Sequence, residues 1–401
     1  MAAQSPTLGG SGLRLLLADR RIGVILAAIL VTNLGYGMII PILPIYAKSF
    51  GVSYGAIGFL ISSFAIARLI TDLACRQLVE RLGYLRSVTF GVIVVSISSL
   101  GNAVAPSFDL AVAARFAAGL GSAVLFTALY GYLLAIARPE LLGRTMGLFW
   151  GTFGIGSIAG APIGGLLSHV FGLRAPLFGY AAMSAIAGLG FARIQRREIV
   201  IGFAPAPTDA GEATWRSTLR NPVVRTALVS NFASFWTWSA ATITLLPLYA
   251  HRTLGMTPLA IGGAIALLGT AELFLLYPAG SWSDRVGRRR VLVPGLVSVA
   301  VLTAAIPLTG NRAVFYLLLI GIGLGSGLFG ASVPSLLGTD GPVHSRAIAG
   351  YRFVGDLGFV LAPLSCAWLA GRSGFGWAYV LAAAPLLIAA VLVIRMPAAT
   401  R

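Results

Sequence analysis

The sequence predicts an all-α membrane protein with twelve transmembrane helices in two pseudo-symmetric six-helix bundles. Three observations predict this fold. Of the 401 residues, 57% are hydrophobic and only 10% are charged, whereas soluble domains carry about 25% charged residues. Twelve apolar runs are long enough to cross a hydrocarbon core of about 30 Å, which takes roughly 20 helical residues. Short segments of the first half of the chain also recur in the second half.

The apolar runs are separated by clusters of Arg, Pro or Gly, which are typical of the ends of membrane helices. The segment before Ile22 is polar and has no short apolar core followed by small residues, so we expect no removable signal peptide. The predicted spans extend approximately over 22–45, 56–75, 87–105, 110–134, 145–170, 176–192, 226–250, 259–279, 291–308, 313–336, 347–370 and 377–394.

The positive charge of the chain indicates its orientation. The net charge is +17, which in a soluble protein would suggest a nucleic-acid partner. If the N-terminus is cytoplasmic, 21 of the 29 Lys and Arg residues lie on cytoplasmic segments and five on the other side, as the positive-inside rule requires. We therefore expect a monomeric multi-pass protein of a bacterial inner membrane, with both termini cytoplasmic and no nucleic-acid partner.

An internal repeat at an offset of about 204 residues divides the chain. It predicts an N-terminal six-helix bundle over 1–192, a cytoplasmic linker over 193–225 and a C-terminal six-helix bundle over 226–401. The end of the linker, 215–225, either forms a short amphipathic helix on the membrane or remains a plain tether. The matching segments are Pro44 to Tyr46 with Pro247 to Tyr249, Glu80 to Gly83 with Asp284 to Gly287, and Gly119 to Ser122 with Gly323 to Ser326.

A loop sequence after the eighth span resembles a motif of the major facilitator superfamily. Gly280 is followed there by an acidic-Arg-x-Gly-Arg-Arg run, and the first half carries a reduced copy with Arg76 in place of the glycine. Such a loop can latch a neighbouring helix, since its acidic residue meets a positive helix N-terminus. The gating residues that this resemblance implies are Glu80, Arg81, Gly83, Asp284, Arg285, Gly287, Arg288 and Arg289.

Three further segments resemble the same family. Arg115 with its following glycines is similar to the conserved-arginine motif of the fourth span, and Pro41 with Pro44 resembles the proline pair of the twelve-span drug/proton antiporters. The fifth span resembles the glycine-proline antiporter motif, although Ala161 interrupts its Gly-Pro pair. The resemblance implies secondary active transport by alternating access.

Few ionisable residues lie within the spans. Each would cost about 2.5–3.5 kcal/mol facing lipid at the bilayer centre, so we expect them to face protein or water. Two pairs are spaced i and i+4, on spans 2 and 11, and each pair could neutralise itself within its own helix. Alternatively, these two spans face each other and the charges pair between helices, forming a clasp that helps to close the cytoplasmic side. The clasp residues are Arg68, Asp72, Arg352 and Asp356.

Glu272 is the most isolated acid within a span. A carboxyl group inside the bilayer can be neutral in one conformation and ionised in another, which coupling to protons requires. Glu272 is thus the first proton-coupling candidate, with Asp72 and Asp356 behind it. The alternative is a structural carboxyl bonded to a nearby hydroxyl or to Arg115.

Aromatic residues of spans 5 and 7 suggest an apolar cavity for hydrophobic or cationic solutes. Contact with lipid or packing between helices is the alternative. The substrate-cavity candidates are Arg115, Asn33, Phe149, Trp150, Phe153, Asn231, Phe235, Trp236 and Trp238.

Together these features favour proton-coupled efflux of a small amphiphilic compound or drug. An uptake permease for a metabolite is the alternative, although the spans contain few amide side chains to bind one. A membrane-embedded enzyme is not expected, because the three histidines lie near span ends and no nucleophile or metal-ligand set is apparent. We expect no cofactor and no metal, and the absence of a phosphate-binding loop excludes direct use of ATP.

Overall fold

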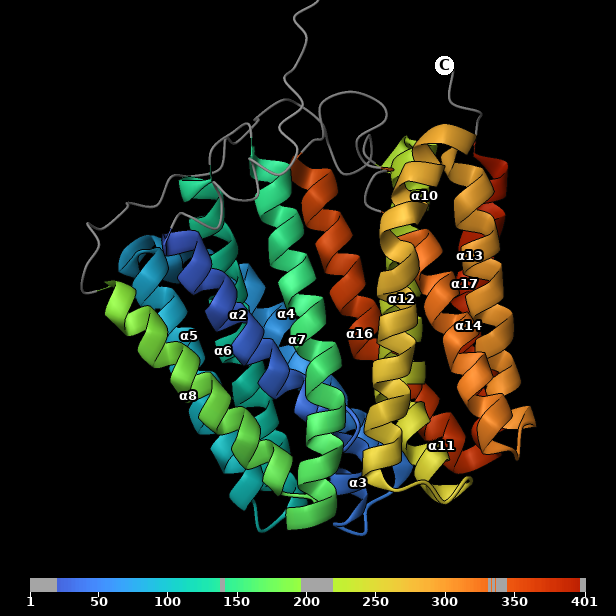
Figure 1. The fold of residues 1–401 in the computed structure, drawn as a ribbon, viewed down its shortest axis with the longest axis horizontal. Helices are drawn as coiled ribbons and strands as arrows, with labels where there is room; N and C mark the ends of the chain where they lie inside the picture. Colours follow the sequence, from blue (N-terminus) through green and yellow to red (C-terminus); the bar gives the residue numbers. More distant parts are fainter. Residues whose placement is uncertain are drawn as a thin grey trace, which may run out of the picture.

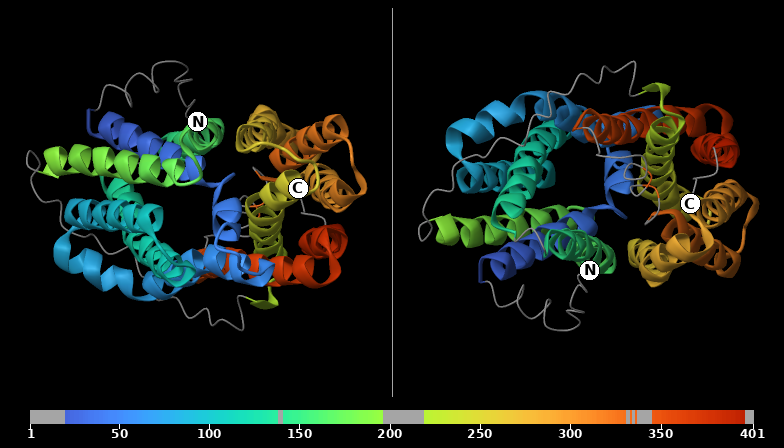
Figure 2. Two further views of the ribbon diagram at one scale, coloured as in Figure 1. Left: turned by 90° about the horizontal axis from the view of Figure 1, so that it is seen from below. Right: turned by 90° about the horizontal axis from the view of Figure 1, so that it is seen from above.

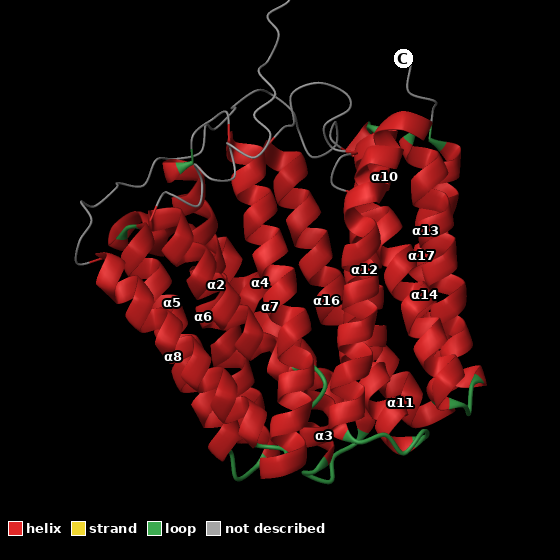
Figure 3. Ribbon diagram, in the orientation of Figure 1, coloured by secondary structure: helices red, strands yellow, loops and turns green. Residues whose placement is uncertain are grey.

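The computed structural model describes residues 20–137, 141–195, 219–330, 333, 336 and 345–396, and within these ranges it contains helices and short loops without a strand (Figure 3). Eleven of the described helices are long and apolar enough to cross a membrane. The helices lie side by side with their axes roughly aligned (Figure 1). The structure thus agrees with the predicted all-α membrane fold.

The two bundles follow each other in the chain. The first contains α2 (Arg20–Ile39), α3 (Leu43–Lys48), α4 (Tyr54–Leu82), α5 (Tyr84–Val104), α6 (Phe108–Ile136), α7 (Leu142–Phe171) and α8 (Ala175–Gln195). The second contains α10 (Pro222–Thr237), the π-helical η2 (Trp238–Leu245), α11 (Leu246–Arg252), α12 (Pro258–Val286), α13 (Arg288–Ala305), the 3-10 turn η3 (Ile306–Leu308), α14 (Arg312–Gly330), α16 (Ser345–Ser373) and α17 (Phe375–Arg395).

The seventh predicted span, 226–250, is helical throughout, but its winding changes along its length. The π-helical η2 joins α10 and α11 without a break. Pro247 accounts for the change, because a proline ring clashes with the carbonyl four residues earlier, here that of Ile243. The wider π-helical turns of η2 lie directly before it, and Thr244 Oγ1 donates to the Ser239 carbonyl at 2.7 Å.

Equivalent positions of the two halves make equivalent contacts. The Tyr46 hydroxyl donates to the Asn102 carbonyl, and the Tyr249 hydroxyl donates to the Thr309 carbonyl, both at 2.6 Å. Glycines also meet in both halves, since a Cβ atom built on Gly91 would lie 2.7 Å from the Gly121 carbonyl oxygen and one built on Gly295 would lie 2.9 Å from that of Gly325. The sequence repeat therefore corresponds to a repeated packing arrangement.

Two ends of the molecule can be distinguished by charge. The end at the top of Figure 1, where α2 begins and α17 ends, carries Arg21, Arg86, Arg144 and Arg395 at helix termini; we call it the basic end. The opposite end carries α3 and α11, which contact each other. The bundles meet along two further helix pairs, α4 with α16 and α7 with α12, and Figure 2 shows the two bundles from both ends.

Most of the predicted linker, residues 196–218, lies outside the described residues. The helix α8 continues to Gln195 and α10 begins at Pro222, where the Asn221 side chain accepts hydrogen bonds from the backbone of Val223 and Val224.

Candidate functional site

The contact between α4 and α16 runs from the opposite end to mid-helix. Near the opposite end Gly58 lies against the backbone of Pro363, where a Cβ atom would have no room. One turn further, the Ser62 hydroxyl donates to the Val360 carbonyl at 2.6 Å. Small residues thus bring the two helices close together and place the charged residues of both helices face to face.

The clasp residues pair between these helices, as the clasp hypothesis requires. Arg68 Nη2 of α4 forms an ion pair with Asp356 Oδ1 of α16. Arg352 Nη2 of α16 lies 3.8 Å from Asp72 Oδ2 of α4. Asp356 is almost fully buried, with 6% of its side chain exposed, whereas 52% of the Arg352 side chain is exposed. The Arg68–Asp356 pair is therefore the stronger of the two, since exposed pairs are weakened by solvent.

The clasp lies deeper in the molecule than a gate at the cytoplasmic mouth would. Arg68 is the fifteenth of the 29 residues of α4, and Asp356 is the twelfth of the 29 residues of α16. Both pairs are formed although α7 and α12 diverge towards the basic end (Figure 1). That the clasp separates when the cytoplasmic side opens stays a prediction, and the structure places its charges near the middle of both helices.

The second contact between the bundles, α7 with α12, is closest towards the opposite end. A Cβ atom at Gly262 would lie 2.4 Å from the Ala161 carbonyl oxygen, and one at Gly269 would lie 2.6 Å from the Ile158 side chain. Nearer the basic end, a Cβ atom at Gly154 would lie 3.8 Å from Leu273, which is ordinary contact. Beyond this level the two helices diverge (Figure 1).

Glu272 lies on the inward side of α12, beside this contact. It follows Gly269 by three residues, so its side chain shares a face with the residue that meets α7. Phe274, which points about 200° away around the helix, is 76% exposed. Among the described residues no hydrogen bond or ion pair of the Glu272 carboxyl group is found, and Arg115 contacts other groups. The alternative of a structural carboxyl bonded to Arg115 is therefore not supported.

A cluster of aromatic side chains on α6 and α7 lies near the level at which α7 and α12 diverge. The centre of the Trp150 ring lies 5.1 Å from that of Phe149 and 5.7 Å from that of Phe153. The ring centres of Phe153 and Phe126 are also 5.7 Å apart. Phe149 is buried, whereas Trp150 is 56% exposed. Trp150 precedes Gly154 by one helical turn and so lies on the face of α7 that turns towards α12, at the level where these helices diverge. Of the aromatic candidates, Trp150 has the most accessible ring.

The other cavity candidates hold helices together. Asn33 is buried and donates to the Ile29 carbonyl of its own helix at 2.9 Å. Asn231 donates to the Tyr351 carbonyl at 2.7 Å and Trp236 Nε1 to the Leu381 carbonyl at 3.1 Å. Asn231 and Trp236 thus join helices within the second bundle, whereas Asn33 bonds within its own helix. Phe235 and Trp238 are half-buried. Phe235 lies beside Gly355, and the ring centres of Trp238 and Phe359 are 5.6 Å apart.

Arg115 is buried inside the first bundle, 4% exposed, and does not line an opening. Its guanidinium lies 4.4 Å from the centre of the Phe64 ring. Its Nε has no hydrogen-bond partner in the part of the chain that the structure describes. The aromatic face of Phe64 thus stabilises this buried cation.

The two loop motifs have a similar backbone conformation at their equivalent glycines, Gly83 and Gly287. Gly83 has φ 79° and Gly287 has φ 95°, values that side-chain-bearing residues rarely adopt, and each ends one helix and begins the next. Glu80, Arg81 and Arg285 occupy the last turn before their glycine, and Arg288 and Arg289 the first turn after it. The side chain of Asp284, in the last turn of α12, lies outside the described part of the structure.

A contact at the opposite end, which the sequence did not predict, joins the bundles around Tyr54. Arg252 Nη1 of the second bundle donates to the Tyr54 hydroxyl of the first. The cationic groups of Lys48 and Arg252 lie 5.1 and 5.5 Å from the Tyr54 ring centre, and the Phe375 ring meets it edge-on at 5.8 Å. Lys48 and Arg252 are separated by the repeat offset of 204 residues, a signal that could have identified them.

Replacing Tyr54 should loosen this contact. Tyr54→Ala removes the ring and the hydroxyl, whereas Tyr54→Phe removes only the hydrogen bond and serves as the milder control. We expect Tyr54→Ala to shift the population towards states open at the opposite end by about fivefold, the effect of one lost cation–π contact. Spin labels at the exposed positions Asp109 and Ala313 would report longer distances. Unchanged distances in Tyr54→Ala would exclude a closing role for Tyr54.

The sequence matches the family model of the Major Facilitator Superfamily over residues 25–340 and again over 227–400. The chain belongs to the major facilitator superfamily. It is therefore a multi-pass membrane transporter for small molecules and not an enzyme.

The relatives of this superfamily member differ in what their names state. Multidrug resistance protein 2 of Bacillus subtilis (strain 168) is 25% identical to the chain over 284 residues, 70% of each protein. The structure resembles that of a bacterial homolog of the human lysosomal transporter Spinster, with a TM-score of 0.77, 14% identity and coverage of 96% of this chain and 97% of that chain. It also resembles the structure of the D-xylose-proton symporter, with a TM-score of 0.76 and 15% identity. The match covers 94% of this chain and 98% of the symporter.

Proposed function

We propose that this superfamily member exports small amphiphilic compounds in exchange for protons. The observation that carries the proposal is Glu272, a carboxyl group within a membrane-spanning helix that faces the interior and has no partner among the described residues. A group of this kind can take up a proton from one side of the membrane and release it to the other as the bundles rock. The relationship to Multidrug resistance protein 2 supports the direction of transport.

The conformation supports alternating access around this carboxyl group. The opposite end is held by the Tyr54 contact and by the α7 and α12 glycines, while these helices diverge towards the basic end. Because arginines concentrate at the basic end, we assign that end to the cytoplasm of a bacterial cell. In this proposal the structure represents an inward-facing state, and the domains are an N-terminal bundle, a cytoplasmic linker and a C-terminal bundle.

The cargo class follows from the side chains near the divergence of α7 and α12. The accessible Trp150 ring offers a π face, and Glu272 offers a negative charge once it has released its proton. These groups suit a lipophilic cation. The amides Asn33 and Asn231, which a hydrophilic metabolite would require, are used in contacts within the bundles. This use of the amides favours an exporter of amphiphiles over an uptake permease.

The clasp and the loop motifs complete the proposed cycle. The clasp lies at mid-depth and is formed in the inward-facing state. We therefore propose that it seals the lateral gap between α4 and α16 while the ends of the bundles move. The loop motifs around Gly83 and Gly287, at the basic end, then close the cytoplasmic side in the outward-facing state. Asp72 and Asp356 belong to the clasp in this proposal, and proton coupling is assigned to Glu272.

Efflux from cells tests this function. Cells that express the protein and are loaded with ethidium, a lipophilic cation, should lose it faster than control cells. A protonophore should remove the difference, because it dissipates the proton gradient. Parallel assays with neutral and anionic dyes define the charge preference. Efflux of ethidium that equals that of control cells, together with proton-driven uptake of a sugar or another hydrophilic solute, would favour the uptake permease instead.

A further inference from the structure

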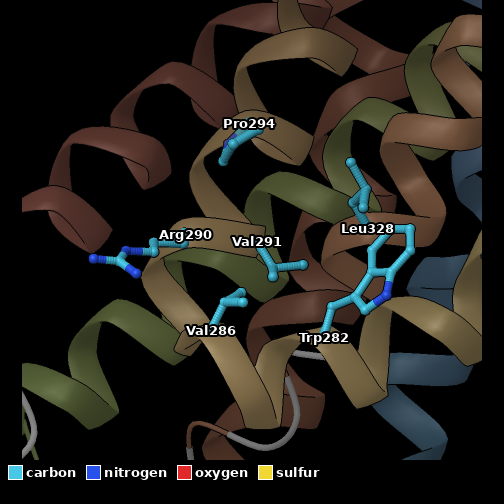
Figure 4. A pocket seen from close by; sticks show the side chains of 6 residues that line it. All are labelled: Trp282, Val286, Arg290, Val291, Pro294 and Leu328. Carbon is cyan, nitrogen blue, oxygen red and sulfur yellow. The ribbon is translucent and has the colours of Figure 1, made fainter.

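A groove at the basic end of the second bundle lies beside the loop motif around Gly287, and the proposed transport cycle binds no substrate or proton there. It has a volume of about 370 Å³ and lies between α12, α13 and α14 (Figure 4). Five of the residues that line it are apolar and one is charged. They are Trp282 and Val286 of α12, Arg290, Val291 and Pro294 of α13, and Leu328 of α14.

The groove continues into a face of α13 that contacts lipid. Pro294, Val297 and Val301 follow Arg290 by four, seven and eleven residues, so all of them share one helical face. Val301 is 56% exposed, and α13 packs against α12, α14 and α17 of its own bundle, so the exposed apolar side chains on its outer face meet acyl chains. At the groove itself Trp282 is 46% exposed. An apolar track thus runs from the groove towards the membrane interior.

The end of this apolar track that lies at the basic end of the molecule is positively charged. Arg290 lies at the edge of the groove, and its guanidinium points away from the apolar side chains (Figure 4). Arg285 and Arg289 are also exposed at this end, and the first turn of α13 contains no acidic residue. The edge of the groove therefore attracts anions at the depth where lipid headgroups lie.

We propose that this groove binds an anionic phospholipid. Arg290 holds the headgroup phosphate, and an acyl chain lies against Trp282, Val291 and Leu328 before it continues along α13. A neutral, zwitterionic lipid would gain less from the concentration of arginines. A second copy of the chain would need about 800 Å² of surface, or roughly 20–30 residues, on each partner, whereas six residues line this groove. The site is separate from Glu272, so the proposal does not depend on the substrate or the coupling ion.

Native mass spectrometry of the purified full-length protein tests the site. Dioleoylphosphatidylglycerol and dioleoylphosphatidylcholine are added in turn, and the retained lipids are counted. We expect the first lipid to be retained in preference to the second, and Arg290→Gln to weaken its retention by about fivefold, the contribution of one arginine near a membrane surface. Arg289→Gln is the matched control, because it removes the same charge from the neighbouring position, which does not line the groove.

A second pair of variants tests the apolar part of the groove. Val286→Trp fills the groove from its exposed edge and should reduce retention of the anionic lipid. Val314→Trp places the same side chain at a valine of similar exposure, 44% against 48%, at the opposite end, and should have no effect. Equal losses in Arg290→Gln and Arg289→Gln would indicate unspecific attraction by the basic end and overturn the proposal. Full retention in Val286→Trp would overturn it as well.

Discussion

Glu272→Gln is expected to abolish proton-driven transport while the protein remains folded. Glutamine has nearly the same shape as glutamic acid but cannot release a proton, so a conformational cycle would no longer move one. In proteoliposomes a step of one pH unit should drive about a tenfold ratio of ethidium across the membrane for one-to-one exchange, since one unit is about 1.4 kcal/mol. With Glu272→Gln the ratio should remain near one.

Two controls separate coupling from folding. Glu272→Asp retains a carboxyl group and should retain part of the proton-driven ratio. Asp109→Asn makes the equivalent chemical change at an exposed position at the opposite end and should leave the ratio unchanged. Exchange of labelled against unlabelled ethidium without a gradient should continue in Glu272→Gln, which would demonstrate that the bundles still rock. A full proton-driven ratio in this variant would exclude Glu272 as the coupling group.

Breaking the Arg68–Asp356 pair should have the largest effect on stability. Arg68→Leu leaves the carboxylate of Asp356 buried without its partner, and such a loss costs about 3–5 kcal/mol. The midpoint of thermal unfolding, measured in detergent, should fall accordingly. The exchanged double variant Arg68→Asp with Asp356→Arg should recover part of this loss, because the opposite charges again face each other across α4 and α16.

The second clasp pair provides the matched comparison. The charged atoms of Asp72 and Arg352 lie 3.8 Å apart, and the Arg352 side chain is half exposed. Asp72→Asn should therefore cost less than about 1 kcal/mol, as for pairs screened by solvent. If Arg68→Leu and Asp72→Asn lowered the unfolding midpoint equally, or if the exchanged pair were as unstable as Arg68→Leu, direct pairing across the helices would not account for the stability.

Several features of the site were predictable because spacing and chain direction determine them. Arg68 and Asp72 share one helical face, as do Arg352 and Asp356, and two antiparallel helices that face each other bring opposite charges together. Gly83 and Gly287 were predictable for a different reason, since a direct connection between two helices requires a backbone conformation that glycine adopts easily. In each case a local rule leaves few solutions.

Other features depend on which face of a helix meets which neighbour. Asn231 and Trp236 resemble cavity residues in the sequence, yet they bond to the backbone of α16 and α17, whereas the Trp150 ring is 56% exposed. The contact around Tyr54 joins residues almost 200 positions apart, and the groove at Trp282 needs three helices.

The amino-acid sequence by itself determined the membrane fold, the duplication and the place of Glu272 within an apolar span, and it left the pairing of charges between α4 and α16 as one of two alternatives. Apolar length, repeated segments and i, i+4 spacing are properties of the chain alone. Only the tertiary structure decided that these charges pair between helices, which aromatic rings are accessible and where the clasp lies in depth. The physical reason is that side chains facing lipid and side chains facing protein are equally apolar, so hydropathy does not distinguish the faces of a membrane helix.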